Sequence, residues 1–371
     1  MSKDFLEIFR GVPDPRDEKN RRYALDEILF LCVCAVISGA EGWSAIAQFG
    51  QAKLAWFRNY LAYDHGIPNE DTIAWVIGRL RVQAFEACFV EWVQGIVGTG
   101  EGEIIAIDGK TARRSHDRSK GKSPLHMVSA WACKQRVSLG QRATSEKSNE
   151  ITAIPALLDL LEIKGALITI DAMGCQSEIA QRITAKKADY VLALKGNQGH
   201  LHEAVVHYFE AAEAADFTHV PIKTHQQIDS GHGRVETRAH YLIDDLSTLP
   251  NRDKWPGLSS IGLVVSTRFN KRSKVESVER RYYLCSITHI NLFAEATRAH
   301  WGIENQLHWV LDMVFREDES RIRSGSTPQI LNMLRQLANN LLRKMDSKLS
   351  IKARRFQAAL DDTFRAKALF Q

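Results

Sequence analysis

The stretch Ile104–Ser115, IIAIDGKTARRS, decides how the rest of the chain is interpreted. Its first four residues are apolar and predict a buried strand, and the residue that follows them is an acid, Asp108. Three basic residues, Lys110, Arg113 and Arg114, come directly afterwards. A buried carboxylate is costly unless it is paired or bound to a metal, so we expect a cation at Asp108.

A second predicted strand also consists of apolar residues followed by an acid. The segments between residues 103 and 145 predict three consecutive strands, and a helix follows them before the apolar run ALITIDAM, which contains Asp171. In a mixed sheet of this order the first and fourth strands are parallel neighbours. We therefore expect Asp108 and Asp171 at the same edge of the sheet, although either acid alone could be a strand-terminal turn residue or a cap.

The pair of acids points to a divalent metal. Two carboxylates held close together repel each other unless a cation lies between them. Mg²⁺ and Mn²⁺ prefer oxygen ligands of this kind, and the usual chemistry of such sites is in-line displacement at phosphorus.

A third acid is expected on a long amphipathic helix over residues 291–315, NLFAEATRAHWGIENQLHWVLDMVF. His300, Glu304 and His308 recur at four-residue spacing and share one face of that helix. Asp312 is one step further along and is the rival third ligand. Glu304 could also be a surface acid paired with Arg298 or His308.

The charge distribution favours a polyanionic partner. The 371 residues carry a net charge of +5, but the basic residues concentrate at 110–147 and 321–371, and the other parts are net acidic. Such zones are typical of phosphate-backbone binding, although solvated surface charge is the alternative. The chain has no signal-peptide pattern, no apolar run long enough to cross a bilayer and no C-x-x-C pair among its six cysteines, so we expect a soluble intracellular protein with reduced thiols.

The spacing of the apolar residues divides the chain into two regions. Residues 1–98 predict an all-helical N-terminal domain, and Gly98, Gly100 and Gly102 mark a linker. Residues 102–371 predict an α/β domain with a β-rich insertion at about 205–288.

Several motifs together resemble the DDE-class insertion-sequence transposases, in particular the H-repeat-associated (ISAs-type) branch. The matching segments are DPRDEKNRRYALDEIL, GIPNEDT, IAIDGKTAR, TIDAMGCQ, YVLALKGNQ, SGHGRVETR and HWGIENQLHWVLDMVFREDESRIR. The resemblance implies a ribonuclease-H-like mixed sheet with a β-rich insertion, in which Asp108, Asp171 and Glu304 are the catalytic and metal-binding triad. It also implies a Mg²⁺- or Mn²⁺-dependent DNA transposase with endonuclease activity, which cuts and joins double-stranded DNA at terminal inverted repeats, acts as a homodimer on DNA, and is cytoplasmic or nucleoid-associated.

The phosphate contacts are expected close to this triad. Related transposases place Arg four residues before the glutamate and Lys seven residues after it, whereas this chain has His300 and Leu311 there. We expect Arg298 or His308 to replace them. The complete set of expected DNA contacts is Lys110, Arg113, Arg114, Lys195, Asn197, Arg234, Arg298, His300 and His308. Two other functions stay open: a structure-specific nuclease on the same fold, and a non-catalytic DNA-binding descendant of a transposase.

Overall fold

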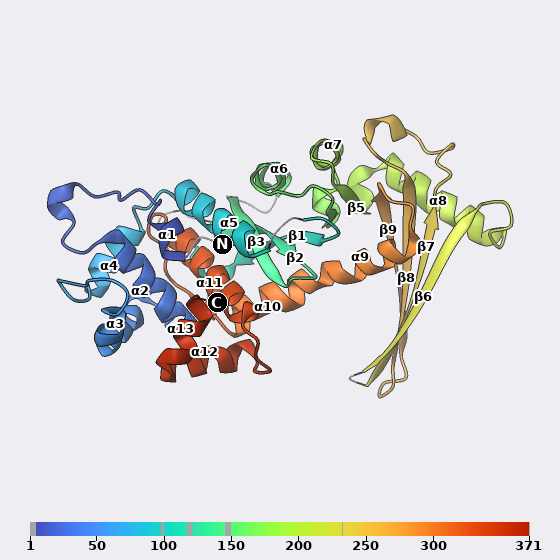
Figure 1. The fold of residues 1–371 in the computed structure, drawn as a ribbon. Coiled ribbons are helices and arrows are strands. Elements are labelled where there is room, and N and C mark those ends of the chain that lie inside the picture. The colour runs from blue at the N-terminus through green and yellow to red at the C-terminus, as the bar shows by residue number, and fades with distance from the viewer. Residues whose placement is uncertain are drawn as a thin grey trace.

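The computed structural model describes residues 5–97, 100–116, 121, 123–144, 150–231 and 233–370. Gly98 of the expected linker, His232 of the SGHGRVETR motif and parts of the basic zone 110–147 lie outside these residues. The molecule is elongated, with helices from both ends of the chain on one side, the sheet in the middle and four long strands at the opposite end (Figure 1).

One sheet of nine strands runs through the described part of the chain, in the order β3-β2-β1-β4-β5-β9-β8-β7-β6. Its strands are β1 (Ile104–Ala112), β2 (Leu125–Ala132), β3 (Val137–Thr144), β4 (Leu167–Ile170), β5 (Asp189–Leu194), β6 (Ile222–Gly231), β7 (Arg234–Ile243), β8 (Ser260–Asn270) and β9 (Glu276–Cys285). The expected mixed sheet of ribonuclease-H-like type is confirmed, because β1 pairs antiparallel with β2 and parallel with β4.

The pairing of β1 with β4 sets the direction of both acids. Ile104 lies opposite Leu167 in this ladder, and Asp108 and Asp171 each follow four residues later. Because side chains alternate between the faces of a sheet, both acids belong to the face that carries Ile104 and Leu167. One detail differs from the sequence prediction: β1 does not end at Asp108 but continues to Ala112, since β2 keeps pairing with it.

Helices cover both faces of the central strands (Figure 1). The helices α6 (Glu150–Leu160) and α7 (Ser177–Ala185) lie on one face, and α9 (Ile290–Gly302) crosses the other. Phe293 and Ala296 of α9 share an apolar cluster with Ile104 and Leu167. The helix α9 therefore packs on the face toward which Asp108 and Asp171 are directed.

The β-rich insertion extends the central sheet. It follows α8 (His200–Ala214) and consists of the antiparallel strands β6 to β9. Its last strand, β9, pairs antiparallel with β5, with Leu192 opposite Leu284. The insertion is thus continuous with the sheet that carries the acids, and the same helix, α9, contacts β1, β4, β6 and β7.

The helical end of the molecule combines both termini of the chain. Its helices are α1 (Phe5–Phe9), α2 (Leu25–Ile37), α3 (Trp43–Phe57), α4 (Glu70–Ile77), α5 (Val82–Val97), α11 (Thr327–Lys344), α12 (Ile351–Leu360) and α13 (Asp362–Leu369). In α2 every residue except Asp26 is buried, and α11 packs along it. A domain boundary near residue 98 stays a prediction, because the C-terminal helices share this layer with the N-terminal ones.

The basic zone at 321–371 is partly interior, so only some of its charge is available to DNA, and a DNA-facing role for its exposed lysines and arginines stays a prediction. Four of its arginines, Arg335, Arg354, Arg355 and Arg365, are at most 9% exposed. Arg355 donates to the backbone carbonyl of Val36 at 3.0 Å, and it also donates to the carbonyl of Val314. A guanidinium has five donors and a flat apolar face, so it can be buried where carbonyls and aromatic rings surround it.

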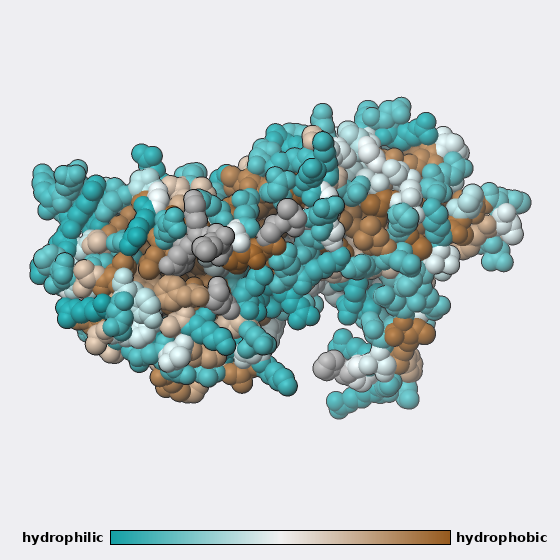
Figure 2. Space-filling model, viewed as in Figure 1, coloured by the Kyte–Doolittle hydropathy of each residue, from teal (hydrophilic) through white to brown (hydrophobic). Residues whose placement is uncertain are grey.

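The surface of the molecule is mainly hydrophilic in the view of Figure 2. A hydrophobic group stands out at the lower end of the long strands, where Ile228, Val275 and Val278 are exposed (Figure 2). None of the described helices is both long and apolar enough to span a bilayer. The six cysteines are free thiols and five of them are buried, as the sequence predicts.

Candidate active site

A cavity of about 440 Å³ opens between the central strands, β9 and the end of α9. Asp108, Asp171 and Glu304 all line it, and we call it the acidic cavity. Lys195, His300 and Trp301 belong to its wall as well. The two strand acids therefore share one cavity with Glu304, which lies more than 130 residues after Asp171 in the sequence.

The electrostatics of Asp108 reflect burial and neighbouring acids. Burial, the charge of Asp171 and, more weakly, the charges of Glu304 and Glu150 together raise the pKa of this carboxyl to about 7, against the opposing effect of a hydrogen bond from the backbone N–H of Gly109. The carboxylates are thus close enough to repel each other. A cation bound among them would relieve this repulsion.

Asp171 has a structural role in addition to its place in the cavity. Its Oδ1 accepts hydrogen bonds from the backbone N–H groups of Met173 at 3.1 Å and Gly174 at 3.5 Å. Burial and then the charge of Glu150 raise the pKa of Asp171. Asp171 can therefore cap the turn and also serve the cavity, since the cap uses Oδ1 and leaves Oδ2 available.

Glu304 lies in an irregular turn, which differs from the continuous helix that we expected. A π-helical turn at Ile303–His308 separates α9 from α10 (Trp309–Met313). Such turns insert an extra residue into a helix and occur frequently at functional sites. Glu304 is exposed to the cavity here, whereas its neighbours Ile303 and Leu307 are buried.

Asp312, the rival third ligand, is directed elsewhere. Its Oδ1 lies 2.7 Å from the ammonium of Lys110, and Asp312 is absent from the wall of the acidic cavity. Lys110 also pairs with Glu317 and lies 3.6 Å from Asp318. Burial lowers the pKa of Lys110, but Glu317 and Asp312 more than offset this, so its charge is retained and already compensated by acids. The placement favours Glu304 as the third acid and offers no free ammonium for a phosphate at Lys110.

The two histidines next to the acids are neutral near pH 7. His308 is buried, its Nδ1 lies 3.5 Å from Oδ2 of Asp108, and burial lowers its pKa to about 3. Burial lowers the pKa of His300 to about 4, and its Nδ1 lies 2.9 Å from the hydroxyl of Thr169. Neither side chain offers a positive charge to DNA at this pH.

The other expected DNA contacts are spread over the molecule. Lys195 is exposed on the cavity wall, whereas Asn197 donates to the carbonyl of Ala172 at 2.7 Å and so holds the turn after Asp171. Arg113 and Arg114 are exposed beyond the end of β1, and Arg113 lies 3.4 Å from Asp318. Arg234 is exposed at the far end of β7, and Arg298 lines a separate small pocket.

A buried pair behind the acids was not identified from the sequence. His126 and Glu150 are both buried, and Nε2 of His126 lies 2.6 Å from Oε1 of Glu150. They lie against Gly109, where an added Cβ would overlap both side chains. The only sequence signal was a lone histidine within the apolar run of β2, which does not reveal its partner.

The donor set fits a hard divalent cation. The cavity supplies carboxylate oxygens from two strands and one helix, and these are the ligands that Mg²⁺ and Mn²⁺ prefer. Among the residues that the structure describes, no three His, Cys, Asp or Glu side chains are already gathered closely enough to form a metal cluster. The residues therefore fit the ion by chemistry, while their side chains need to draw together to hold it.

Family models of transposases, and proteins that are named as transposases, match this chain. A family model described as "Transposase DDE domain" matches residues 99–341, and one described as "DDE_Tnp_1-associated" matches residues 6–93. The "Putative transposase YncI" of Escherichia coli O157:H7 is 44% identical over 371 residues, covering 99% of this chain and 94% of that protein. The "H repeat-associated putative transposase YhhI" of Escherichia coli K12 is 38% identical and covers 99% and 98% of the two chains. The "Inactive transposase YbfQ" of the same strain is 40% identical over 80 residues, covering 22% of this chain and 95% of that protein.

Proposed function

Because this chain belongs to the family of DDE-domain transposases of the H-repeat branch, we propose that it cleaves and rejoins DNA at the ends of an insertion sequence. The observation that carries the proposal is the placement of Asp108, Asp171 and Glu304 on the wall of one cavity. Proteins of this family generally depend on a divalent metal. The three carboxylates are the residues that would hold Mg²⁺ or Mn²⁺.

A bound divalent cation would supply activation of the attacking and leaving oxygens at phosphorus. The chain itself contributes position and charge. The turn cap fixes Asp171, and His308 packs against the carboxylate of Asp108. Lys195 and Arg281 line the cavity with the acids and attract the phosphodiester that enters it.

The reaction proceeds in two displacements. Water first attacks the phosphodiester at the element end and releases a 3′-hydroxyl. That hydroxyl then attacks a phosphodiester of the target DNA, bonds to its phosphorus and displaces the 3′-hydroxyl of the target strand as the leaving group. No covalent bond between protein and DNA is needed, so the mechanism requires no nucleophilic side chain.

The partner in this proposal is double-stranded DNA with terminal inverted repeats. The two ends of an element are related by symmetry, which favours a homodimer on the DNA. The site of action is the bacterial cytoplasm, with nucleoid association when the protein is on DNA.

The substitution Asp171→Asn tests the chemistry. Asn caps turns as well as Asp does, so the turn is kept, but the negative charge is lost. We expect strand cleavage of an oligonucleotide that carries the element end, in Mg²⁺ or Mn²⁺, to fall about a thousandfold or more. Binding to the same DNA should be unchanged or slightly tighter, because a negative charge facing the phosphates is gone.

The exposed acid Asp253 provides the matched control, since it is remote from the cavity wall. Asp253→Asn should cleave like the wild type. Near wild-type cleavage by Asp171→Asn would reduce Asp171 to a turn cap and remove the chemical basis of the proposal. Wild-type protein that binds the element end but never cuts it would instead indicate a non-catalytic descendant, and cutting that ignores the end sequence would indicate a structure-specific nuclease.

A further inference from the structure

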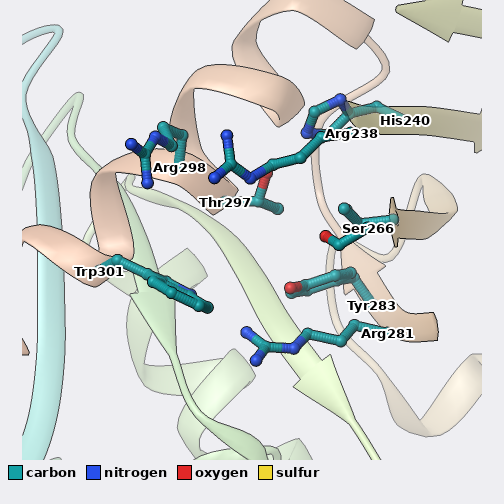
Figure 3. Close-up of a pocket in the computed structure, with 9 residues that line it drawn as sticks. Arg238, His240, Ser266, Arg281, Tyr283, Thr297, Arg298 and Trp301 are labelled. Carbon is teal, nitrogen blue, oxygen red and sulfur yellow. The ribbon is translucent and has the colours of Figure 1, made fainter. Parts of the chain in front are cut away.

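The two faces of the central sheet differ in the charges that they carry. On the face that α9 covers, arginine side chains gather beside the acidic cavity, and Figure 3 shows Arg238, Arg281 and Arg298 around a small pocket there. Behind β1, on the opposite face, lies the buried carboxylate of Glu150, the first residue of α6. The described residues that form the wall of the acidic cavity do not include Glu150. Burying a fourth carboxylate behind three others is costly, so its position requires an explanation.

The alternation of side chains along β1 places Glu150 behind the first acid. Asp108 is directed to the α9 face, so Gly109 faces the other way. An added Cβ at Gly109 would overlap Oε1 of Glu150 and would lie 2.5 Å from Nε2 of His126. The pair of His126 and Glu150 therefore lies directly against the backbone next to Asp108, and only glycine leaves room for it.

Both ring nitrogens of His126 have partners. Nε2 lies 2.6 Å from Oε1 of Glu150, and Nδ1 lies 2.7 Å from the hydroxyl of Thr111, which is opposite His126 in the ladder between β1 and β2. With the proton on Nε2, the ring donates to Glu150 and accepts from Thr111, so all three groups are satisfied. The ring is neutral in this arrangement, and Glu150 keeps its negative charge.

The same helix also supports the second acid. Ile154, one turn after Glu150 in α6, is buried, and an added Cβ at Gly174 would lie 2.7 Å from its Cδ1. Gly174 belongs to the turn at Ala172–Gly174, and its N–H donates to Oδ1 of Asp171. The start of α6 therefore packs tightly against the backbone beside both strand acids.

The charge of Glu150 reaches both of these acids. Burial is the main cause of the raised pKa of Asp171, and the charge of Glu150 is the second. For the pKa of Asp108, burial and the charge of Asp171 come first, and the charge of Glu150 adds to them. A negative charge that disfavours two ionised carboxylates also attracts a divalent cation that would neutralise them.

We propose that Glu150, held by His126, is a positioning residue of the divalent-metal site, which supports the strand acids from the opposite face of β1 and strengthens cation binding by its charge. The inference rests on the proposed function and concerns the same site. Because the three acids have to draw together around a cation, a fixed pair of acids on the strands reduces the cost of that step. Glu150 acts through Asp108 and Asp171 and is not itself a ligand.

Glu150→Gln is the test variant. Glutamine still accepts the hydrogen bond from Nε2 of His126 through its carbonyl oxygen, so the contact is kept and only the charge is lost. Binding of Mn²⁺ to the protein without DNA is measured from the electron paramagnetic resonance signal of the free ion, and urea unfolding verifies the fold. We expect the affinity for Mn²⁺ to be about tenfold weaker than in the wild type.

Asp159 provides the matched control on the same helix. It is exposed, and its Oδ2 lies 2.6 Å from Arg182. Asp159→Asn should bind Mn²⁺ like the wild type. An affinity of Glu150→Gln equal to that of the wild type would overturn the inference.

Cleavage of element-end DNA distinguishes a charge that acts from behind the strand from a direct ligand. All three acids are intact in Glu150→Gln, so saturating Mn²⁺ should restore cleavage close to the wild-type rate, while the half-saturating concentration rises about tenfold. Loss of cleavage at every Mn²⁺ concentration, as expected for Asp171→Asn, would make Glu150 a ligand and overturn the positioning role.

Gly109→Ala tests the contact independently of the charge. The added methyl group overlaps His126 and Glu150, so the pair or the strand has to shift, and we expect weaker Mn²⁺ binding by the folded variant. Unchanged Mn²⁺ binding by folded Gly109→Ala would show that the contact does not position the acids. Wild-type protein that binds no Mn²⁺ would instead refute the metal site of the proposed function, whereas a wild-type affinity in Glu150→Gln refutes only this inference.

Discussion

The two ends of this molecule use charged side chains in opposite ways. At the helical end, arginines of α11 to α13 lie in the interior and donate to backbone carbonyls, as Arg355 does to Val36 and Val314. At the sheet end, Arg281 and Arg298 stand on the walls of cavities beside carboxylates. In the net charge of +5, each of these arginines counts the same, wherever it lies.

This difference shows that the role of an arginine depends on the groups that surround its guanidinium in the folded protein. A buried guanidinium that donates to backbone carbonyls links helices and is not available to DNA. A guanidinium beside a cavity keeps donors that a phosphate can accept. Changes at the helical end should therefore alter stability, and changes at the sheet end should alter DNA chemistry.

The largest effect is expected from Glu304→Gln at the sheet end. Glutamine keeps the size of the side chain but removes one negative charge from the acidic cavity. Cleavage of element-end DNA should fall about a thousandfold, with little change in the free energy of unfolding. Asp312→Asn is the contrasting variant, because Asp312 pairs with Lys110 and does not line the cavity. It should lose some stability but keep most of its cleavage rate, and the reverse pattern would make Asp312 the third ligand.

A smaller effect, now on stability, is expected from Arg355→Met at the helical end. The substitution leaves the carbonyls of Val36 and Val314 without their donor and removes a guanidinium that lies 4.3 Å from the ring centroid of Phe315. The free energy of unfolding in urea should fall by about 3 kcal/mol. The salt dependence of DNA binding should not change. If a folded Arg355→Met variant binds DNA with a weaker salt dependence, the helical end also contacts DNA, which would contradict the division of roles between the two ends.

The smallest effect is expected from the double change Arg113→Gln and Arg114→Gln. Both residues are exposed, Arg113 to 83% of its side chain, and they follow the strand that carries Asp108. DNA affinity should fall by about tenfold or less, and its salt dependence should decrease by one to about two phosphate contacts. The free energy of unfolding should stay within about 0.5 kcal/mol of the wild type. If the salt dependence of DNA binding does not change, both residues are solvated surface charges that do not contact DNA.

The neighbouring positions of the two acid-bearing strands could be predicted from the sequence. An apolar strand pattern that ends in an acid twice, in strands whose order makes them parallel neighbours, is enough to place Asp108 and Asp171 side by side. This works because side-chain alternation and right-handed connectivity are local rules that hold in any sheet. The position of Glu304 on the facing helix followed from spacing, although its π-helical turn did not.

The sequence by itself therefore determined the mixed sheet, the two strand acids and the family that the motifs resemble. Only the tertiary structure decided which charges are free: it buries Arg355 against a carbonyl 319 residues away, pairs Lys110 with acids more than 200 residues further on, and keeps His300 and His308 neutral. The physical reason is that desolvation and ion pairing depend on which distant segments surround a group. Hydrophobic periodicity records which face of an element is buried, but it does not record what lies against that face.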